Sequence, residues 1–299
     1  MTEAVQRCGF VAIVGKPNVG KSTLLNRILG TKISIVTPKP QTTRHRILGV
    51  KIQGATQILF VDTPGLQLRG RRAIDRVMNR NAEQSIHDAD IILFLSEYGR
   101  WNDLDDNVLR AIRESGRPVV GVVNKIDKAT GRLALLPALQ SLSERLDFDA
   151  LFPMSALTGD NTAALVDYLA EHLPESPWLY PENASTDKDD RFRVAEIIRE
   201  KLMMELQQEL PYGLAVEIER WEADETQTAI AATIWLDRES QKPILIGKNG
   251  ARLKKIGTSA RKEVVKLTGG RVHLQLWAKT RKNWSDDARL LQSLGYEAP

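Results

Sequence analysis

The fold of this chain is most tightly constrained by a series of short, almost unbroken apolar runs in its first 125 residues. Such runs are typical of strands buried on both faces, as in a parallel sheet covered by helices. Stretches with helical periodicity separate them and cover residues 21–29, 72–87, 106–114 and 136–146. This alternation predicts a doubly wound α/β domain. The apolar runs themselves are residues 10–14, 58–61, 91–95 and 119–123.

One pair of segments departs from the parallel pattern. Residues 47–52 and 57–61 are separated by a short turn around Gly54. That spacing predicts a β-hairpin, which would place one antiparallel strand at the edge of the sheet. With this strand included, we expect a mixed, mostly parallel sheet with helices on both faces.

The order of elements changes after a segment rich in proline and acidic residues. Helix, strand, strand, helix, helix and strand follow it, an α+β order that predicts a second domain. The expected elements are residues 192–210, 214–221, 229–236, 243–246, 251–267 and 272–277. The expected boundaries are residues 7–175 for the first domain, 176–190 for a linker, 191–285 for the second domain and 286–299 for a tail.

A glycine-rich motif joins the first apolar run to the first helical stretch. It fits the pattern G-x-x-x-x-G-K-[ST] in the strand–loop–helix context that supports this interpretation. Backbone N–H groups of such a loop surround phosphates, its lysine reaches the β- and γ-phosphates, and its serine binds Mg²⁺. The sequence therefore predicts a nucleoside triphosphate site formed by Gly15, Lys16, Pro17, Asn18, Val19, Gly20, Lys21 and Ser22.

Two later motifs complete this site. Asp62-Thr63-Pro64-Gly65 ends an apolar run, where the carboxylate can meet Mg²⁺ through water and the Gly65 amide can meet the γ-phosphate. Asn124-Lys125-Ile126-Asp127 ends another, and the Asp127 carboxylate can accept hydrogen bonds from N1–H and N2–H₂ of guanine. Adenine lacks these donors, so the pairing discriminates against ATP. Ser155-Ala156 adds a backbone N–H for guanine O6, and the predicted ligand is GTP or GDP with Mg²⁺.

Together with Gln-Thr-Thr-Arg-His-Arg at residues 41–46, these motifs resemble those of the Era GTPases, within the TrmE–Era–EngA group of bacterial GTPases. The resemblance extends over nearly the whole chain. It implies GTP hydrolysis, with Lys21, Thr43 and Gly65 as catalytic residues. It also assigns Ser22, Thr43 and Asp62 to Mg²⁺, with Thr42 in reserve for Thr43. In some members of the group, an asparagine at the position of Asn18 helps hold K⁺, which is open for this chain.

Leu66 directly follows the Asp-x-x-Gly motif, where Ras-type enzymes carry a glutamine that orients water. Leucine has no donor or acceptor for this task. We therefore expect Leu66 to border the nucleotide without ordering water, and we expect intrinsic hydrolysis slower than about 1 s⁻¹.

Charge is concentrated near the C-terminus. Residues 182–241 carry 7 basic and 15 acidic residues, whereas residues 242–299 carry 13 basic and 4 acidic ones. The basic segment contains a G-x-x-G loop between two helical stretches, and in KH domains this loop clamps a single-stranded RNA backbone. Cations recur on one face of the helix that follows it. The predicted RNA-binding residues are Gly247, Lys248, Asn249, Gly250, Arg252, Lys255 and Lys262.

The loop and its flanking elements match the type II KH domain of the Era family. The resemblance implies that the RNA is the 3′ region of 16S ribosomal RNA and that the protein, as a monomer, acts in small (30S) subunit biogenesis and rRNA processing. Trp277 and Trp284 could stack on bases, although we expect packing in the core or anchoring of the tail instead.

Two other functions stay open. The chain could be an RNA-binding module with GTP as a structural ligand, or a GTPase associated peripherally with the inner membrane, because a basic patch also binds anionic lipid. The single cysteine, Cys8, excludes an internal disulfide framework, and the N-terminus lacks the pattern of a signal peptide. We therefore expect a cytoplasmic protein, with membrane contact secondary.

Overall fold

The computed structural model describes residues 5–65, 72–208, 210–224 and 226–296. The chain forms two compact units. The first contains most of the chain up to Asp187. The second begins at Lys188 and includes two short segments of the first half, residues 37–42 and 72–77.

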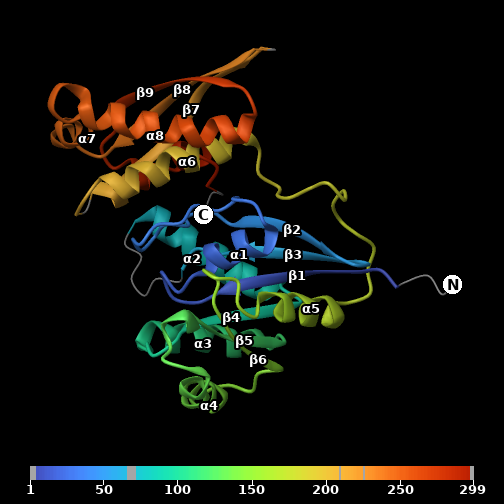
Figure 1. Cartoon of the computed structure of the whole chain (residues 1–299). Coiled ribbons are helices and arrows are strands. Elements are labelled where there is room, and N and C mark those ends of the chain that lie inside the picture. Colours follow the sequence, from blue (N-terminus) through green and yellow to red (C-terminus); the bar gives the residue numbers. More distant parts are fainter. Residues whose placement is uncertain (1–4, 66–71, 209, 225, 297–299) are drawn as a thin grey trace. The chain divides into compact units, whose positions relative to one another are not determined.

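The first half of the chain alternates strands and helices as expected (Figure 1). Glycines in the left-handed region, Gly20 and Gly30, bound the first helix at its two ends. The strands are β1 (Arg7–Val14), β2 (Ile47–Gln53), β3 (Thr56–Asp62), β4 (Ile91–Glu97), β5 (Val119–Asn124) and β6 (Ala150–Met154). The helices are α1 (Lys21–Leu29), α2 (Ala73–Asp88), α3 (Asp103–Ser115), α4 (Leu136–Ser143) and α5 (Thr162–His172).

The described strands of the first unit form one sheet in the order β2-β3-β1-β4-β5-β6. Only β2 runs antiparallel, paired with β3 through the predicted hairpin. The expected mixed, mostly parallel sheet is confirmed, with its antiparallel strand at an edge. Because the parallel strands β1, β3 and β5 end at the same edge of the sheet, the three nucleotide motifs that follow them are brought together there.

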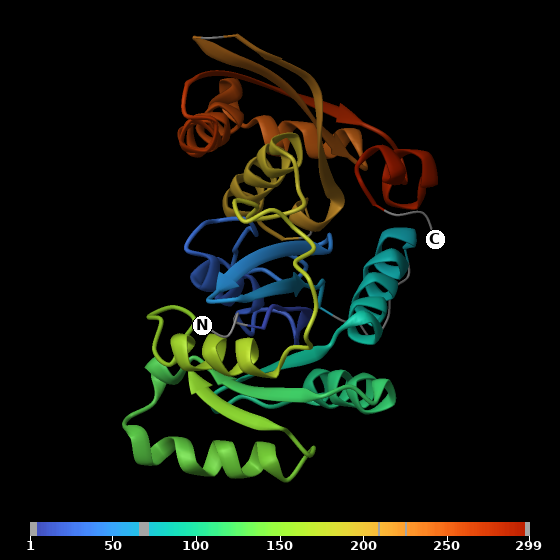
Figure 2. The same cartoon turned by 90° about the vertical axis from the view of Figure 1, so that its right-hand side faces the viewer.

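The structure differs from the expected linker. Residues 174–187 pack along the first unit instead of hanging free, and their trace follows β2 in Figure 2. Gln57 Oε1 accepts the backbone N–H groups of Leu179 and Tyr180 at 2.9 and 3.0 Å. Val50 N donates to Ser185 O at 3.0 Å, so this segment, here called the strap, lies against the edge strand. Proline and acidic residues suggested a linker, but the buried glutamine that holds the strap lies in a distant strand.

The second unit is α+β, as predicted. Its helices are α6 (Asp190–Glu205), α7 (Lys242–Ile246), α8 (Ala251–Thr268) and α9 (Ala288–Ser293). Its strands β7 (Leu214–Ala223), β8 (Gln227–Leu236) and β9 (Arg271–Thr280) form a sheet in that order, with β9 parallel to β8.

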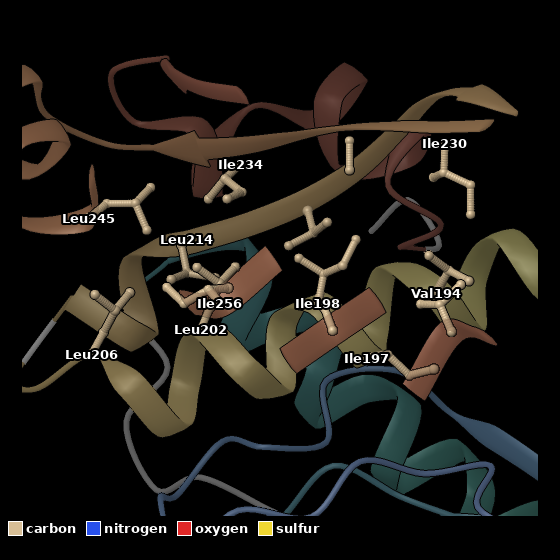
Figure 3. Close-up of a cluster of buried hydrophobic side chains, with 14 of the residues drawn as sticks. Val194, Ile197, Ile198, Leu202, Leu206, Leu214, Ile230, Ile234, Leu245 and Ile256 are labelled. Atoms are coloured by element: carbon tan, nitrogen blue, oxygen red, sulfur yellow. The ribbon is translucent and has the colours of Figure 1, made fainter. Parts of the chain in front are cut away.

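One face of this sheet packs against α6 and α8 around a single apolar core. Leucine, isoleucine and valine side chains from both layers interdigitate there (Figure 3). Core residues drawn in the figure include Val194, Ile198, Leu202, Leu214, Ile230, Ile234, Leu245 and Ile256. Within the described residues, no helix is both long enough and apolar enough to span a membrane.

Candidate nucleotide site and nucleic-acid interface

The loop between β1 and α1 has a backbone that only glycine allows at two positions. Gly15 has φ of 152°, and a Cβ there would lie 2.5 Å from the Leu95 carbonyl oxygen. Gly20 has φ of 112°, and a Cβ there would lie 2.3 Å from Asn124 Nδ2. Both glycines therefore let neighbouring strands and the loop approach closely, which places the loop amides around one point.

Lys21 is folded back into this loop. Its ammonium group is buried and donates to the carbonyl oxygens of Gly15 at 2.9 Å and Lys16 at 3.2 Å. Burial lowers the pKa of Lys21 to about 8, while the Asp62 carboxylate acts in the opposite direction. The lysine is thus held over the loop as a cation that anionic oxygens would stabilise.

Asp62, at the end of β3, is the centre of a cluster of hydroxyl groups. Its Oδ2 accepts from Ser22 Oγ at 2.6 Å, from Ser34 Oγ at 2.8 Å and from Thr43 Oγ1 at 3.5 Å. Ser22 Oγ also lies 2.9 Å from Thr43 Oγ1. The structure therefore brings the three predicted Mg²⁺ residues together and favours Thr43 over Thr42, whose hydroxyl bonds to Thr37 and Lys39.

The second carboxylate oxygen of Asp62 is buried and has no hydrogen-bond partner among the described residues. Burial raises the pKa of this carboxyl, although Lys21 and the three hydroxyls work to lower it. A buried carboxylate beside several hydroxyl oxygens is a set of hard oxygen donors that suits Mg²⁺. The residues present therefore fit the predicted ion.

Ser34 was missed by the sequence analysis. It is 1% exposed and is held by Asn26, which lies one turn after Ser22 on α1. Asn26 Oδ1 accepts the N–H groups of Ile33 and Ser34 at 3.0 Å each, and its Nδ2 donates to Ser34 O at 2.7 Å. No local motif marks either residue, because their contacts depend on how the loop that carries Ser34 packs against α1.

The guanine-specific motif is also assembled. Asn124 Nδ2 donates to Val19 O at 2.7 Å and its Oδ1 accepts from Ala156 N at 2.9 Å, so one amide joins the phosphate loop to the Ser155-Ala156 loop. Asp127 Oδ1 accepts from Ser155 Oγ at 2.5 Å, which orients the carboxylate. These contacts bring the two predicted guanine-binding segments to one place.

Lys125 stabilises this arrangement by joining the phosphate loop to Glu97. It has φ of 66°, and its Nζ donates to Asn18 O and to Glu97 Oε2, each at 2.8 Å. Burial works to raise the pKa of Glu97, but hydrogen bonds from Lys125 and Lys128 outweigh it and hold that pKa below its ordinary value. Glu97 is a second residue that sequence reasoning missed.

Lys16 has a structural role. Its Nζ contacts Asp105 Oδ2 at 2.7 Å in a buried ion pair, and it also donates to Arg100 O. Asp105 in turn accepts from Asn102 N and closes a capping box at the start of α3. Asp105 thus both caps α3 and anchors the phosphate loop through Lys16.

The remaining predicted nucleotide residues lie as follows. Pro17 faces Gly65, whose added Cβ would be 3.1 Å from the proline ring. Thr63 Oγ1 donates to Ile13 O at 2.9 Å and joins β3 to β1. Pro64 follows it, and Ile126 opens a short 3₁₀ turn with Asp127. Leu66 lies outside the described residues.

In the second unit, the G-x-x-G loop has the backbone that its sequence requires. Gly247, Asn249 and Gly250 have φ of 74°, 52° and 76°. At Gly247 an added Cβ would also lie 2.8 Å from Arg252 Cβ. The loop places Lys248 and Asn249 at the tip between α7 and α8.

A hollow of about 320 Å³ opens beside this loop, between α8 and β9. Its helix side carries two cations and a mid-helix glycine, and its strand side carries two leucines. It is lined by Gly250, Leu253, Lys254, Gly257, Thr258, Arg261, Leu274 and Leu276. Gly250 and Gly257 are seven residues apart, a spacing that places them on one side of the helix and could have revealed this face from the sequence.

The predicted cationic face of α8 does not line this hollow. Lys255 is paired with Glu205 at 2.8 Å, and Arg252 donates to Ile244 O. Lys262 is exposed on the same side of the helix as Lys255. Spacing alone located a basic face correctly but could not show which face borders the strand.

The two tryptophans behave differently. Trp284 is 1% exposed and donates from Nε1 to Gly213 O at 3.0 Å, which confirms the anchoring role. Trp277 is 56% exposed, so the expectation that it packs in the core was wrong. It lies on the β9 face opposite to the core, because side chains alternate along a strand.

Comparisons with known proteins give the family of each part of the chain. The family model described as 50S ribosome-binding GTPase matches residues 10–125, and the KH domain model matches residues 209–285. GTPase Era of Glaesserella parasuis is 48% identical over 297 residues, and GTPase Era of Cronobacter sakazakii is 47% identical, each covering 99% of both chains.

Solved structures give the same result. A variant Era from Aquifex aeolicus bound to GDP and AlF₄⁻ superposes with a TM-score of 0.93 and 41% identity, covering 97% of this chain and 99% of the other. A structure of Era in complex with MgGDPNP and nucleotides 1506–1542 of 16S ribosomal RNA matches equally well.

Proposed function

The chain belongs to the Era GTPase family, and from that premise we propose that it is a GTP-dependent switch that binds the 3′ region of 16S ribosomal RNA through its KH domain. GTP hydrolysis is the activity of the family. The proposal further assigns the protein to biogenesis of the small ribosomal subunit and rRNA processing. Its main support is the basic hollow beside the G-x-x-G loop in a chain that matches an RNA-bound Era over almost its full length.

At the nucleotide site, the phosphates would replace the carbonyl groups that Lys21 now contacts, and the loop amides would surround them. Ser22 and Thr43 would hold Mg²⁺ directly, and Asp62 would hold it through water. When bound, the ion would supply positive charge that offsets the charge developing on the phosphates. The Gly65 N–H would contact the γ-phosphate. Asp127, oriented by Ser155, would accept the two guanine donors.

Ser34 is expected to position Asp62 for this ion. Ser34→Ala removes a hydrogen bond to a buried carboxylate, a contact that contributes about 1.5–3 kcal/mol. We therefore expect GDP to dissociate at least about tenfold faster in Mg²⁺, with little change in EDTA. Release of a fluorescent GDP measures both rates. Ser96→Ala, which removes another buried hydroxyl bonded to Val122 O, is the matched control and should leave both unchanged.

The K⁺ question concerns Asn18, whose φ is 61° and whose carbonyl oxygen accepts from Lys125. We propose that its side chain supplies an oxygen to a monovalent cation near the phosphates. Intrinsic hydrolysis should stay below about 1 s⁻¹. Hydrolysis should be at least about tenfold faster in KCl than in NaCl. This acceleration is far smaller than the 10³–10⁵-fold acceleration that an arginine finger supplies. Asn18→Ala should abolish the difference. Equal rates in both salts would exclude the cation role.

Crosslinking the GTP-bound protein to RNA and sequencing the protected fragment tests the RNA partner directly. Recovery of the 3′ region of 16S ribosomal RNA is expected, and recovery of unrelated RNA would refute the assignment. Single-turnover hydrolysis with and without small subunits separates a switch from a module in which GTP is structural. Peripheral membrane binding is the secondary proposal; sedimentation with anionic vesicles in the presence of competitor RNA tests it.

A further inference from the structure

The outer face of β9 carries a row of exposed side chains that no function above uses. Val272, Leu274, Leu276 and Ala278 point toward the core of the second unit. The alternate residues lie on the other face, and all are exposed: Arg271, His273, Gln275, Trp277 and Lys279. We call this row the outer β9 face.

The neighbouring strand leaves this row uncovered. On β8, the residues paired with His273 and Gln275 are Ala229 and Ala231, whose side chains are single methyl groups. A methyl group cannot rise above the sheet to cover a longer neighbour. Trp277 itself is paired with Thr233, which is also a short side chain, and its ring remains 56% exposed although it lies within a regular sheet. A large aromatic ring left open on a strand is a ready stacking platform for a planar group.

Charge on this face favours an anionic ligand at the β9 side. Two carboxylates of β7 are ion-paired, Glu219 with Lys279 and Glu222 with Arg220, whereas Glu217 accepts from Trp235 Nε1 and keeps its negative charge on the β7 side. Arg271, in contrast, has no ion-pair partner among the residues that the structure describes. Gln275 Nε2 lies 3.1 Å from His273 Nε2, so two further polar groups stand together between Arg271 and Trp277.

The outer β9 face is continuous with the hollow already described. β9 is an edge strand of its sheet, and its Leu274 and Leu276 line the hollow beside α8. Trp277 and Gln275 are their immediate neighbours in the chain, on the opposite face of the same strand. A polynucleotide leaving the hollow across the free edge of β9 would therefore reach the outer β9 face next.

We propose that the outer β9 face is a second RNA contact that receives the single-stranded RNA next to the nucleotides held in the hollow. Trp277 stacks on a base, His273 and Gln275 offer hydrogen bonds to base edges, and Arg271 meets phosphate. This proposal rests on RNA binding by the KH domain. One cation without an ion-pair partner in the described residues, an aromatic ring and an amide suit a nucleic acid better than an apolar protein surface, since no large aliphatic side chain joins the row.

Binding of two RNAs tests the proposal: the stretch of nucleotides 1506–1542 and the shortest fragment of it that still binds. Trp277→Ala should weaken the long RNA about 5- to 150-fold, the range for one stacked base, and leave the short fragment unchanged. Trp277→Phe should keep most of the affinity. Leu136→Ala, at another exposed apolar side chain, is the control. GTP hydrolysis by each variant verifies that the protein is intact.

Each possible result of these RNA-binding measurements supports or overturns one specific assignment. Equal weakening of long and short RNA would assign Trp277 to the hollow and overturn a second contact. Unchanged binding of both RNAs by Trp277→Ala would also overturn the second contact. The assignment of RNA binding to the KH domain would still stand if the loop variant Lys248→Asp/Asn249→Asp loses binding of both RNAs. If that loop variant retains both RNAs, the proposed function itself fails. Quenching of tryptophan fluorescence by the long RNA, present in the original protein and reduced in Trp277→Phe, would support the stack.

Discussion

Replacing Asp127 by asparagine is expected to weaken GTP binding by about 10²–10⁴-fold and to create binding of XTP. The carboxylate would accept two hydrogen bonds from guanine, and bonds to a charged group contribute about 1.5–3 kcal/mol each. Asparagine presents one acceptor and one donor. Xanthine, which has a carbonyl in place of the guanine amine, matches that pair, so the preference should reverse.

Competition of GTP and XTP against a fluorescent GDP measures this change of nucleotide preference. Ser155→Ala removes the hydroxyl that contacts Asp127 Oδ1 but leaves the carboxylate in place. It should lower GTP affinity modestly without any gain for XTP. Loss of both nucleotides in Asp127→Asn would indicate a collapsed site rather than altered specificity, and unchanged GTP affinity would remove Asp127 from guanine recognition.

The second large effect is expected at the tip of the G-x-x-G loop. The double variant Lys248→Asp/Asn249→Asp places two negative charges where phosphates would lie, and such juxtaposition costs several kcal/mol, or at least about 100-fold in RNA affinity. The loop should keep its shape, because aspartate tolerates the left-handed φ of 52° at residue 249 nearly as well as asparagine. The salt dependence of binding should also flatten.

Charge reversal on the other face of α8 is the matched comparison. Lys255 and Lys262 were predicted RNA contacts, but neither lines the hollow. Lys255→Asp/Lys262→Asp should therefore weaken RNA binding less than the loop variant, measured with the same RNA across a salt series. A larger loss of RNA affinity in Lys255→Asp/Lys262→Asp than in the loop variant would indicate that RNA binds the face of α8 that residue spacing first suggested.

The nucleotide site could be predicted well from sequence because its residues act through local motifs. Gly15 to Ser22 encode a strand–loop–helix turn, Asp62 ends strand β3, and Asp127 follows the end of β5 by three residues. Ser34, by contrast, reaches Asp62 only because Asn26 holds its backbone from a neighbouring helix. Such contacts depend on tertiary packing, and no pattern of a single segment reveals them.

The RNA site likewise combines features that follow from local sequence with features that depend on tertiary packing. The loop glycines and the helix after them follow from residue type and periodicity. Which side of α8 borders β9, however, depends on how helix and strand pack, and Gly257 lets Leu276 approach the helix closely. Trp277 was expected in the core because tryptophan is usually buried, but strand register places it outside.

The strap has a consequence for solubility. An edge strand such as β2 exposes unpaired backbone groups that can pair with another molecule and begin aggregation. Thr186 forms a bridge with Gly49, and Ser185 accepts the Val50 N–H, so the strap occupies part of that edge. A GTPase fragment ended after α5 would leave the edge and the buried Gln57 uncovered, whereas one ended at Asp187 would keep its own protection against self-association.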